Sequence, residues 1–110
     1  MGIRKDIESG YTDTLDGIII ALCKDLGRRE DAVRDKCCSK RTAMEYEYIN
    51  SRIHTAAREI AGDEADIYIH EIGERTGYAY SSVMKVSEST YKKMKKEIKF
   101  NIAKKLHMID

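Results

Sequence analysis

The stretch Tyr80-Ser-Ser-Val-Met-Lys-Val-Ser-Glu-Ser-Thr-Tyr-Lys-Lys-Met94 decides the fold that this sequence predicts. It has the form of two short helices joined by a tight turn, which is the pattern of a helix-turn-helix motif. Ser87 is a favourable N-cap and Glu88 suits the positive end of a helix dipole, so a lysine-rich helix is expected to start there. Residues 78–84 are expected to form the shorter helix before it.

Apolar residues continue the lysine-rich helix almost to the end of the chain. Tyr91, Met94, Ile98, Ile102 and Leu106 recur at spacings of three and four, which predicts one buried stripe. The other faces carry Lys92, Lys93, Lys95, Lys96, Lys99, Lys104 and Lys105. Because the chain contains no proline and few strand-like alternations, the predicted fold class is all-α.

Two longer apolar stripes upstream predict a helical hairpin over residues 13–61. The first helix is expected to start at Asp13 and to run to about Lys36, unless Gly27 divides it. Ser39 is expected to cap the second helix, whose stripe continues to Ile60. Stripes of this kind favour two antiparallel helices in contact.

Residues 63–109 are predicted to form the helix-turn-helix part of a single domain that spans residues 1–110. Gly62 is expected to end the hairpin in a left-handed conformation, and Asp63 with Asp66 resembles a capping box. The third helix is expected to end at Gly77 and to bury Ala65, Tyr68, Ile69 and Ile72.

Charge is distributed unevenly along a chain whose formal net charge is only +1. Met1 to Met84 contain 12 basic and 16 acidic residues, a net charge of −4, whereas Lys85 to His107 contain 8 lysines and 2 glutamates, a net charge of +6. Positive charge at one end suits a nucleic acid that approaches in one orientation. A solvated lysine face on an ordinary terminal helix is the alternative interpretation.

Several classes of function find no support in the sequence. The odd number of cysteines predicts reduced thiols in a cytosolic protein, and the apolar run Gly17 to Leu22 is too short to cross a membrane. His70-Glu71 lacks the second histidine of a zinc-protease helix, and neither a nucleophile with its base nor a glycine-rich phosphate loop is present. We therefore expect no enzymatic activity, no catalytic residue, no metal site and no cofactor.

The segment from about Ile67 to Ile109 resembles the C-terminal helix-turn-helix of the ArpU-like and RinA-like phage regulators. The resemblance lies in Val86-Ser-Glu-Ser-Thr-Tyr-Lys92, the basic stretch that follows, and the ending Ile102-Ala-Lys-Lys-Leu-His-Met-Ile109. Lys85 stands where a turn glycine is usual in that family, and Ser81 stands where a small alanine is common. The resemblance implies a sigma-factor-like DNA-binding part in a small phage or prophage protein that regulates transcription, such as that of late genes, in the cytoplasm of a bacterial host.

Double-stranded DNA is therefore the expected partner, and the motif predicts which side chains contact it. Base edges are expected to meet Ser87, Glu88, Ser89, Lys92 and Lys93. Phosphates are expected to meet Tyr80, Ser82, Lys85 and Lys96.

A homodimer is also expected, because the hairpin carries more apolar surface than one small C-terminal motif would cover. The hairpin would serve this assembly or a contact with RNA polymerase. Two other functions stay open at this point. One is a DNA-packaging adaptor similar to a small terminase subunit, and the other is a structural helical protein whose lysine face is only solvated.

Overall fold

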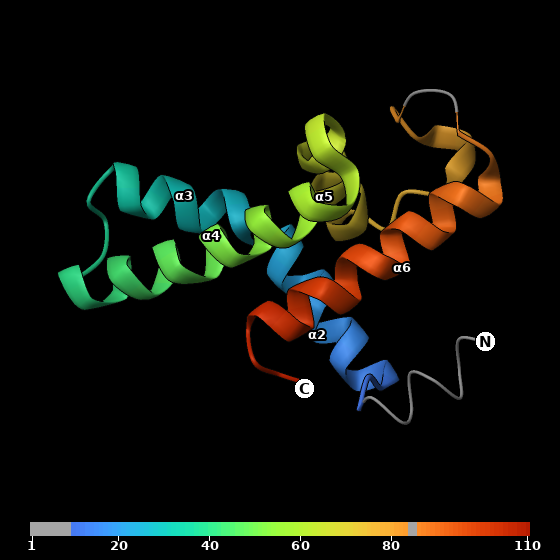
Figure 1. Ribbon diagram of the computed structural model, residues 1–110. Helices are drawn as coiled ribbons and strands as arrows, with labels where there is room; N and C mark the ends of the chain where they lie inside the picture. The colour runs from blue at the N-terminus through green and yellow to red at the C-terminus, as the bar shows by residue number, and fades with distance from the viewer. Residues whose placement is uncertain (1–9, 84–85) are drawn as a thin grey trace.

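The computed structural model describes residues 10–83 and 86–110, and every regular element within them is helical (Figure 1). The predicted all-α class is therefore confirmed. The elements are α2 (Asp13–Lys24), α3 (Leu26–Arg34), α4 (Lys40–Ala61), the 3-10 helix η1 (Gly62–Glu64), α5 (Ala65–Gly73), the 3-10 helix η2 (Tyr78–Tyr80) and α6 (Glu88–Lys105).

The long helix α4 is the centre of the fold. Helices α3, α5 and α6 pack against it, whereas α2 lies against α5 and α6 (Figure 1). In the second half of α4, Ile53, Ala56 and Ala57 are fully buried, and the small alanines let neighbouring helices approach closely. The largest buried side chains of the core come from the surrounding helices and α4 itself, namely Tyr68, Tyr91, Ile19, Ile53, Ile72, Ile98 and Ile102.

The first helix expected over residues 13–36 is divided, an alternative that the sequence left open, but the division into α2 and α3 falls at Asp25. Gly27, the expected point of division, lies inside α3. At the bend the buried Arg29 donates from Nη2 to the Leu22 carbonyl oxygen at 2.6 Å and from Nε to Asn50 Oδ1 at 2.7 Å. The guanidinium thus satisfies a carbonyl at the end of α2 and fastens α3 to α4. The hairpin consists of α3 and α4 alone, since α2 turns away.

Both serines that the sequence predicts as N-caps have that role. Ser39 Oγ accepts from the Thr42 amide at 3.2 Å, and Ser87 Oγ accepts from the Thr90 amide at 3.1 Å. The capping box expected at Asp63 and Asp66 is wrong, because the start of α5 has no side-chain cap and the chain enters it through η1.

Three of the described helices are followed, two positions after their last residue, by a Lys, Arg or His residue in the left-handed region. The φ angles are 55° at Lys36, 56° at Arg75 and 61° at His107. In each case the next amide donates back across the turn to a carbonyl of the helix, at 2.9 Å, in the pairs Cys37 to Ala32, Thr76 to Glu71 and Met108 to Ala103. This is the Schellman arrangement, and the positive side chains of Lys36 and Arg75 suit the negative end of a helix dipole.

The predicted end of the third helix at Gly77 is wrong, since α5 ends at Gly73. Helix α5 meets the last residue of α2 there, backbone against backbone. A Cβ atom added to Gly73 would lie 2.7 Å from both the Cα and the N atom of Lys24, closer than real Cβ contacts allow. Glycine at this position is therefore required by packing.

The predicted helix over residues 78–84 is also wrong within the described part of the chain. Only η2 forms there, and Ser81 has extended backbone angles of φ −73° and ψ 146°; Met84 lies outside the described residues. The reason is visible in the hydrogen bonds. The Ser82 amide donates to the Glu71 carboxylate at 2.6 Å, so it is taken by a side chain of α5 and not by a helical carbonyl.

Replacing Gly73 by alanine should destabilise the protein by about 1–3 kcal/mol, because the two helix backbones must separate to admit a methyl group. Gly77→Ala is the matched control, since nothing lies within 4 Å of its Cβ position and its φ is negative. Urea denaturation of both variants checks this. Equal free energies of unfolding for the two variants would contradict the packing role of Gly73.

Replacing Lys36 by glycine should stabilise the protein by about 0.5–1 kcal/mol, because glycine removes the left-handed strain at this residue but also makes the unfolded chain more flexible. Lys40→Gly, in the first turn of α4, removes the same charge and should lower stability. Thermal unfolding followed by circular dichroism gives the melting temperatures of Lys36→Gly and Lys40→Gly for comparison with that of the parent protein. A melting temperature for Lys36→Gly below that of the parent protein would refute the expectation.

Candidate nucleic-acid interface

The start of α6 is set by its own sequence. Ser87 has extended backbone angles, and its hydroxyl oxygen accepts from the Thr90 amide at 3.1 Å while its hydroxyl donates to the Thr90 hydroxyl oxygen at 2.9 Å. The first turn of the helix therefore begins at Glu88, with its backbone amides directed out of the helix end. Such an end attracts negative charge, including phosphate groups.

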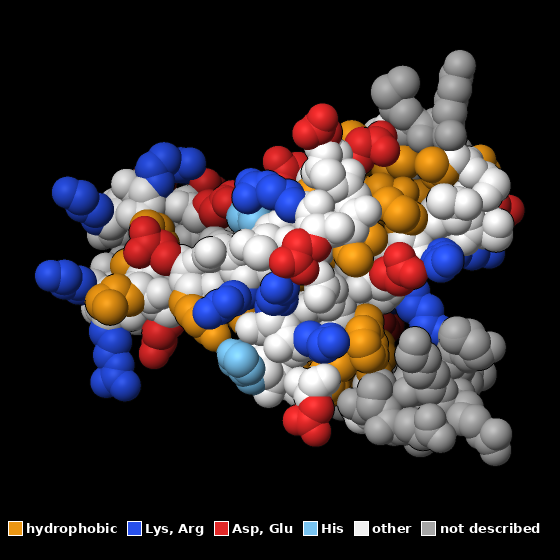
Figure 2. All heavy atoms as spheres, viewed as in Figure 1, with side chains coloured by type: hydrophobic (Ala, Val, Ile, Leu, Met, Phe, Trp, Pro, Cys, Tyr) orange, Lys and Arg blue, Asp and Glu red, His pale blue; other side chains and the backbone are white. Residues whose placement is uncertain are grey.

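The faces of α6 follow directly from helical periodicity. Tyr91, Ile98 and Ile102 are buried against the rest of the protein. Residues spaced by four and three on the opposite side, Ser89, Lys93 and Lys96, are exposed. We call Ser89, Lys93 and Lys96 the outer stripe. Figure 2 shows basic side chains at the edge of the molecule where α6 starts.

Five residues of the first turns were predicted to contact bases, and the structure places all of them at the exposed start of α6 or just before it. They are not equivalent. Lys92 Nζ lies 3.0 Å from Glu88 Oε2, one helical turn away, so these two charges face each other. Ser87 is engaged in the cap. Ser89 and Lys93 belong to the outer stripe, although Ser89 Oγ also lies 3.2 Å from Ser87 Oγ.

The residues predicted to contact phosphate are spread more widely. Tyr80 is 85% exposed at the end of η2, and Lys96 is exposed on α6. Ser82 is exposed, although its backbone amide is held by Glu71. Lys85 lies outside the described residues.

Three lysines of α6 have roles inside the protein that the sequence did not reveal. Lys95 Nζ donates to the Thr76 carbonyl oxygen at 2.7 Å and lies 5.0 Å from the centre of the Tyr91 ring. Burial, followed by repulsion from Lys99, lowers the pKa of Lys95. Two ion pairs of 2.9 Å join other lysines to distant helices, in the pairs Lys99 with Asp16 and Lys105 with Glu59.

A buried carboxylate holds the segment before α6 in place. Glu71, on α5, is only 4% exposed, and its oxygens accept from the Ser81 hydroxyl at 2.6 Å, the Ser82 amide at 2.6 Å and the Tyr91 hydroxyl at 2.7 Å. The Tyr78 hydroxyl adds a bond to the Val86 carbonyl oxygen at 2.6 Å. These bonds join α5, the residues after η2 and the first turn of α6 into one unit. We call Glu71, Ser81, Ser82 and Tyr91 the Glu71 cluster.

The pKa values in the Glu71 cluster follow from its geometry. Burial alone would raise the pKa of Glu71, but the donors Ser81, Ser82 and Tyr91, together with the charge of Lys95, outweigh it and hold the pKa below 4.5. Burial and the bond to Glu71 raise the pKa of Tyr91 to about 12. The sequence analysis did not predict that Glu71 is buried and accepts these bonds. Glu71 lies between Tyr68 and Ile72 of an apolar stripe, and an acidic residue in such a position indicates a buried carboxylate.

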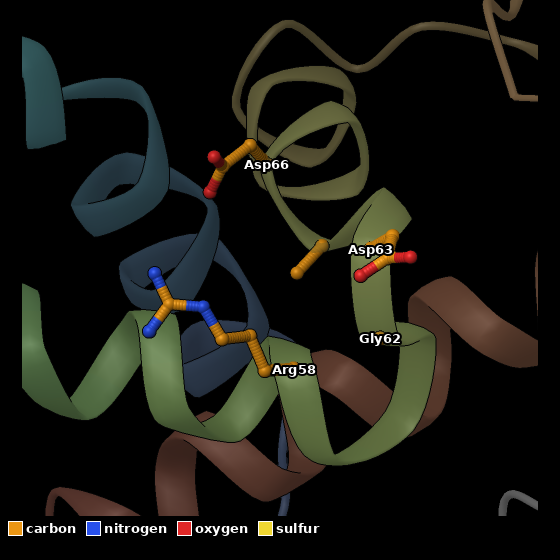
Figure 3. Close-up of a pocket in the computed structure, with 5 residues that line it drawn as sticks. Arg58, Gly62, Asp63 and Asp66 are labelled. Carbon is orange, nitrogen blue, oxygen red and sulfur yellow. The ribbon is translucent and has the colours of Figure 1, made fainter.

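Two hollows lie on the surface outside the outer stripe. One, of about 310 Å³, is lined by Arg58, Gly62, Asp63, Ala65 and Asp66 at the junction of α4 and α5, where the Arg58 and Asp66 side chains lie on facing sides (Figure 3). The other, of about 260 Å³, is lined by Tyr78, Ala79, Ser81, Val83, Val86 and Tyr91, next to the start of α6. The first is lined by side chains of both charges, and the second is lined by uncharged residues that include two tyrosines and a serine.

Across residues 10–83 and 86–110, histidine, cysteine, aspartate and glutamate side chains form no group of three placed to hold a metal ion. No helix in the same residues is long and apolar enough to span a membrane. In comparisons with known proteins, no family model matches the chain, and neither a curated protein nor a solved structure matches it.

Replacing Glu71 by glutamine should destabilise the protein by about 1–3 kcal/mol at pH 7, because an amide group cannot accept all the bonds that the buried carboxylate accepts. Since the folded pKa of Glu71 is depressed, its contribution is present above the unfolded pKa and is lost as pH falls through the folded value. The difference in the free energy of unfolding between the parent protein and Glu71→Gln should therefore be constant from pH 5 to 7 and shrink below about pH 4.

Urea denaturation across this pH range gives the measurement. Glu74→Gln is the control, because Glu74 is exposed at the end of the same helix. A Glu71→Gln penalty that persists unchanged at low pH would show that the charge of Glu71 does not produce the stabilisation.

Proposed function

We propose that this protein is a sequence-specific DNA-binding regulator of transcription, of the phage or prophage kind. The observation that carries the proposal is the outer stripe. It starts beside a capped helix N-terminus, it faces away from the core, and it carries Lys93 and Lys96 on successive turns. A helix of this kind fits the major groove of DNA, where residues near its N-terminus meet base edges.

Lys93 is the principal base-contacting residue in this proposal. Its ammonium group can donate to O6 and N7 of guanine, and Ser89, one turn earlier, can donate to or accept from a neighbouring base. Lys96 lies farther along the outer stripe, and with the exposed hydroxyl of Tyr80 it would contact phosphates on the walls of the groove.

Glu88 and Lys92 act as a pair. A surface ion pair contributes little to stability, so it can open at small cost when DNA arrives. Glu88 can then accept from N4 of cytosine while Lys92 contacts guanine or phosphate. The negative charge of Glu88 also weakens the attraction between the N-terminus of α6 and the phosphates of any DNA. This weaker general attraction favours specific binding over binding to random sequences.

The Glu71 cluster supports the proposal because base contacts require a helix whose position is fixed. Four polar groups from α5, the following segment and α6 determine where the outer stripe points. The resemblance of residues 67–109 to phage regulators adds the biological setting, which is control of phage genes in the bacterial cytoplasm. We infer a binding role and no catalysis.

Selection from a pool of random duplexes at two salt concentrations, followed by fluorescence anisotropy, tests the proposal. A regulator should enrich one motif and bind it at least about a thousandfold more tightly than bulk DNA. Weak binding without a motif that disappears at higher salt would refute it, and would favour the packaging or structural alternatives.

Replacing Lys93 by alanine should weaken binding to the selected site by about 1–3 kcal/mol and relax base preference at one position. Lys96→Ala should weaken binding to all sequences alike and reduce the salt dependence by about one counterion. Lys40→Ala is the control, because it removes an equal charge at the N-terminal end of α4, outside α6. If all three variants lose the same affinity on specific and random duplexes, the assignment of base contacts fails.

A further inference from the structure

The first half of α4 has a face that no other described helix covers. Helix α3 lies along one side of it, where Arg29 reaches Asn50 and Glu30 reaches His54. The bonds from α6 fall farther along, at Ala56 and Glu59, and come from Asn101 and Lys105.

Large hydrophobic side chains are exposed on this uncovered face. Met44 is 63% exposed and Tyr48, one turn later, is 44% exposed. Figure 2 shows hydrophobic side chains along the lower edge of the arm that α3 and α4 form. Arg52, one further turn along, lies with its guanidinium 4.9 Å from the centre of the Tyr48 ring. Methionine, tyrosine and arginine are residue types that are enriched at protein interfaces.

The charges around this apolar pair alternate in sign along α4. Arg41 precedes Met44 and Glu45 follows it, and Arg41 Nε lies 3.9 Å from Glu45 Oε2. Arg52 follows Tyr48 by one helical turn. In a parallel pair of identical helices, Glu45 would face Glu45 and Arg52 would face Arg52, which is unfavourable. In an antiparallel pair centred near Tyr48, Glu45 of each copy faces Arg52 of the other, and the two tyrosine rings meet at the centre.

We propose that the protein forms a homodimer through this face, with the α4 helices antiparallel across a two-fold axis near Tyr48. The dimer surface consists of Met44, Glu45, Tyr48 and Arg52. Because a single helix pair buries little area, the dissociation constant is on the order of tens of micromolar without DNA. The charge pattern selects a second copy as the occupant, since the face is complementary to itself.

Dimerisation does not depend on DNA binding. If the proposed function also holds, the two-fold axis places two copies of the outer stripe on one molecule, and the DNA site should contain two related half-sites. Both ideas can be tested separately with duplexes that contain one half-site or two.

Sedimentation equilibrium of the full chain from about 5 to 500 µM gives the association constant directly, with a range that brackets the expected value. Tyr48→Asp should weaken association at least about tenfold, because it places two like charges at the centre of the interface. Tyr80→Asp, at an exposed tyrosine outside the dimer surface, should leave association unchanged. A parent protein that stays monomeric throughout the range overturns the proposal.

Charge reversal tests the antiparallel arrangement. Glu45→Arg and Arg52→Glu should each weaken the dimer, while the double variant should restore it, because the pairs are exchanged between the copies. If the double variant dimerises as weakly as the two single variants, the antiparallel pairing is overturned. Tyr48→Asp should bind a duplex with one half-site as the parent does, so loss of DNA binding and loss of dimerisation are distinguishable.

Discussion

The arrangement of the C-terminal half depends on the buried carboxylate of Glu71. An acid removed from water is unfavourable unless each oxygen finds donors, and here the Ser81 hydroxyl, the Ser82 amide and the Tyr91 hydroxyl provide them. Those donors come from a loop and from another helix. Satisfying one carboxylate therefore fixes the path of the chain between α5 and α6 and the direction in which α6 leaves it.

The same cluster fixes α6 with its apolar stripe inward, the orientation that the spacing of that stripe predicts. Tyr91 points inward to reach Glu71 and stacks with Tyr68 at a ring distance of 5.7 Å. Once Tyr91 is inward, Lys95 must lie over the protein and Lys93 must lie outside. Lysines that look alike in the sequence thus separate into those that contact other helices, such as Lys95, and those on the exposed side of α6, such as Lys93. A charge count alone overstates the exposed basic surface of α6.

In the N-terminal half, Arg29 has the corresponding role. By donating to the Leu22 carbonyl oxygen and to Asn50, it stabilises the bend that sends α2 away from α4. Helix α2 then covers α5 and α6, and its contact with α5 is close enough to require Gly73. As a result, among the helices that the structure describes, α3 is the one that lies beside the first half of α4. The uncovered face with Met44 and Tyr48 follows from that bend.

The sequence by itself determined the features that depend on neighbouring residues. Ser39 and Ser87 cap helices because their hydroxyls need only an amide three residues ahead, and the stripe from Tyr91 to Leu106 follows from spacing alone. Tertiary structure decided the rest. Lys36, Arg75 and His107 end helices in a conformation that local preference assigns to glycine, and Ser81 and Ser82 leave the expected helix because Glu71 takes their donors. The position of the break at Asp25, the division of the lysines and the burial of Glu71 each depend on a partner far away in the chain, and no local pattern specifies which partner that is.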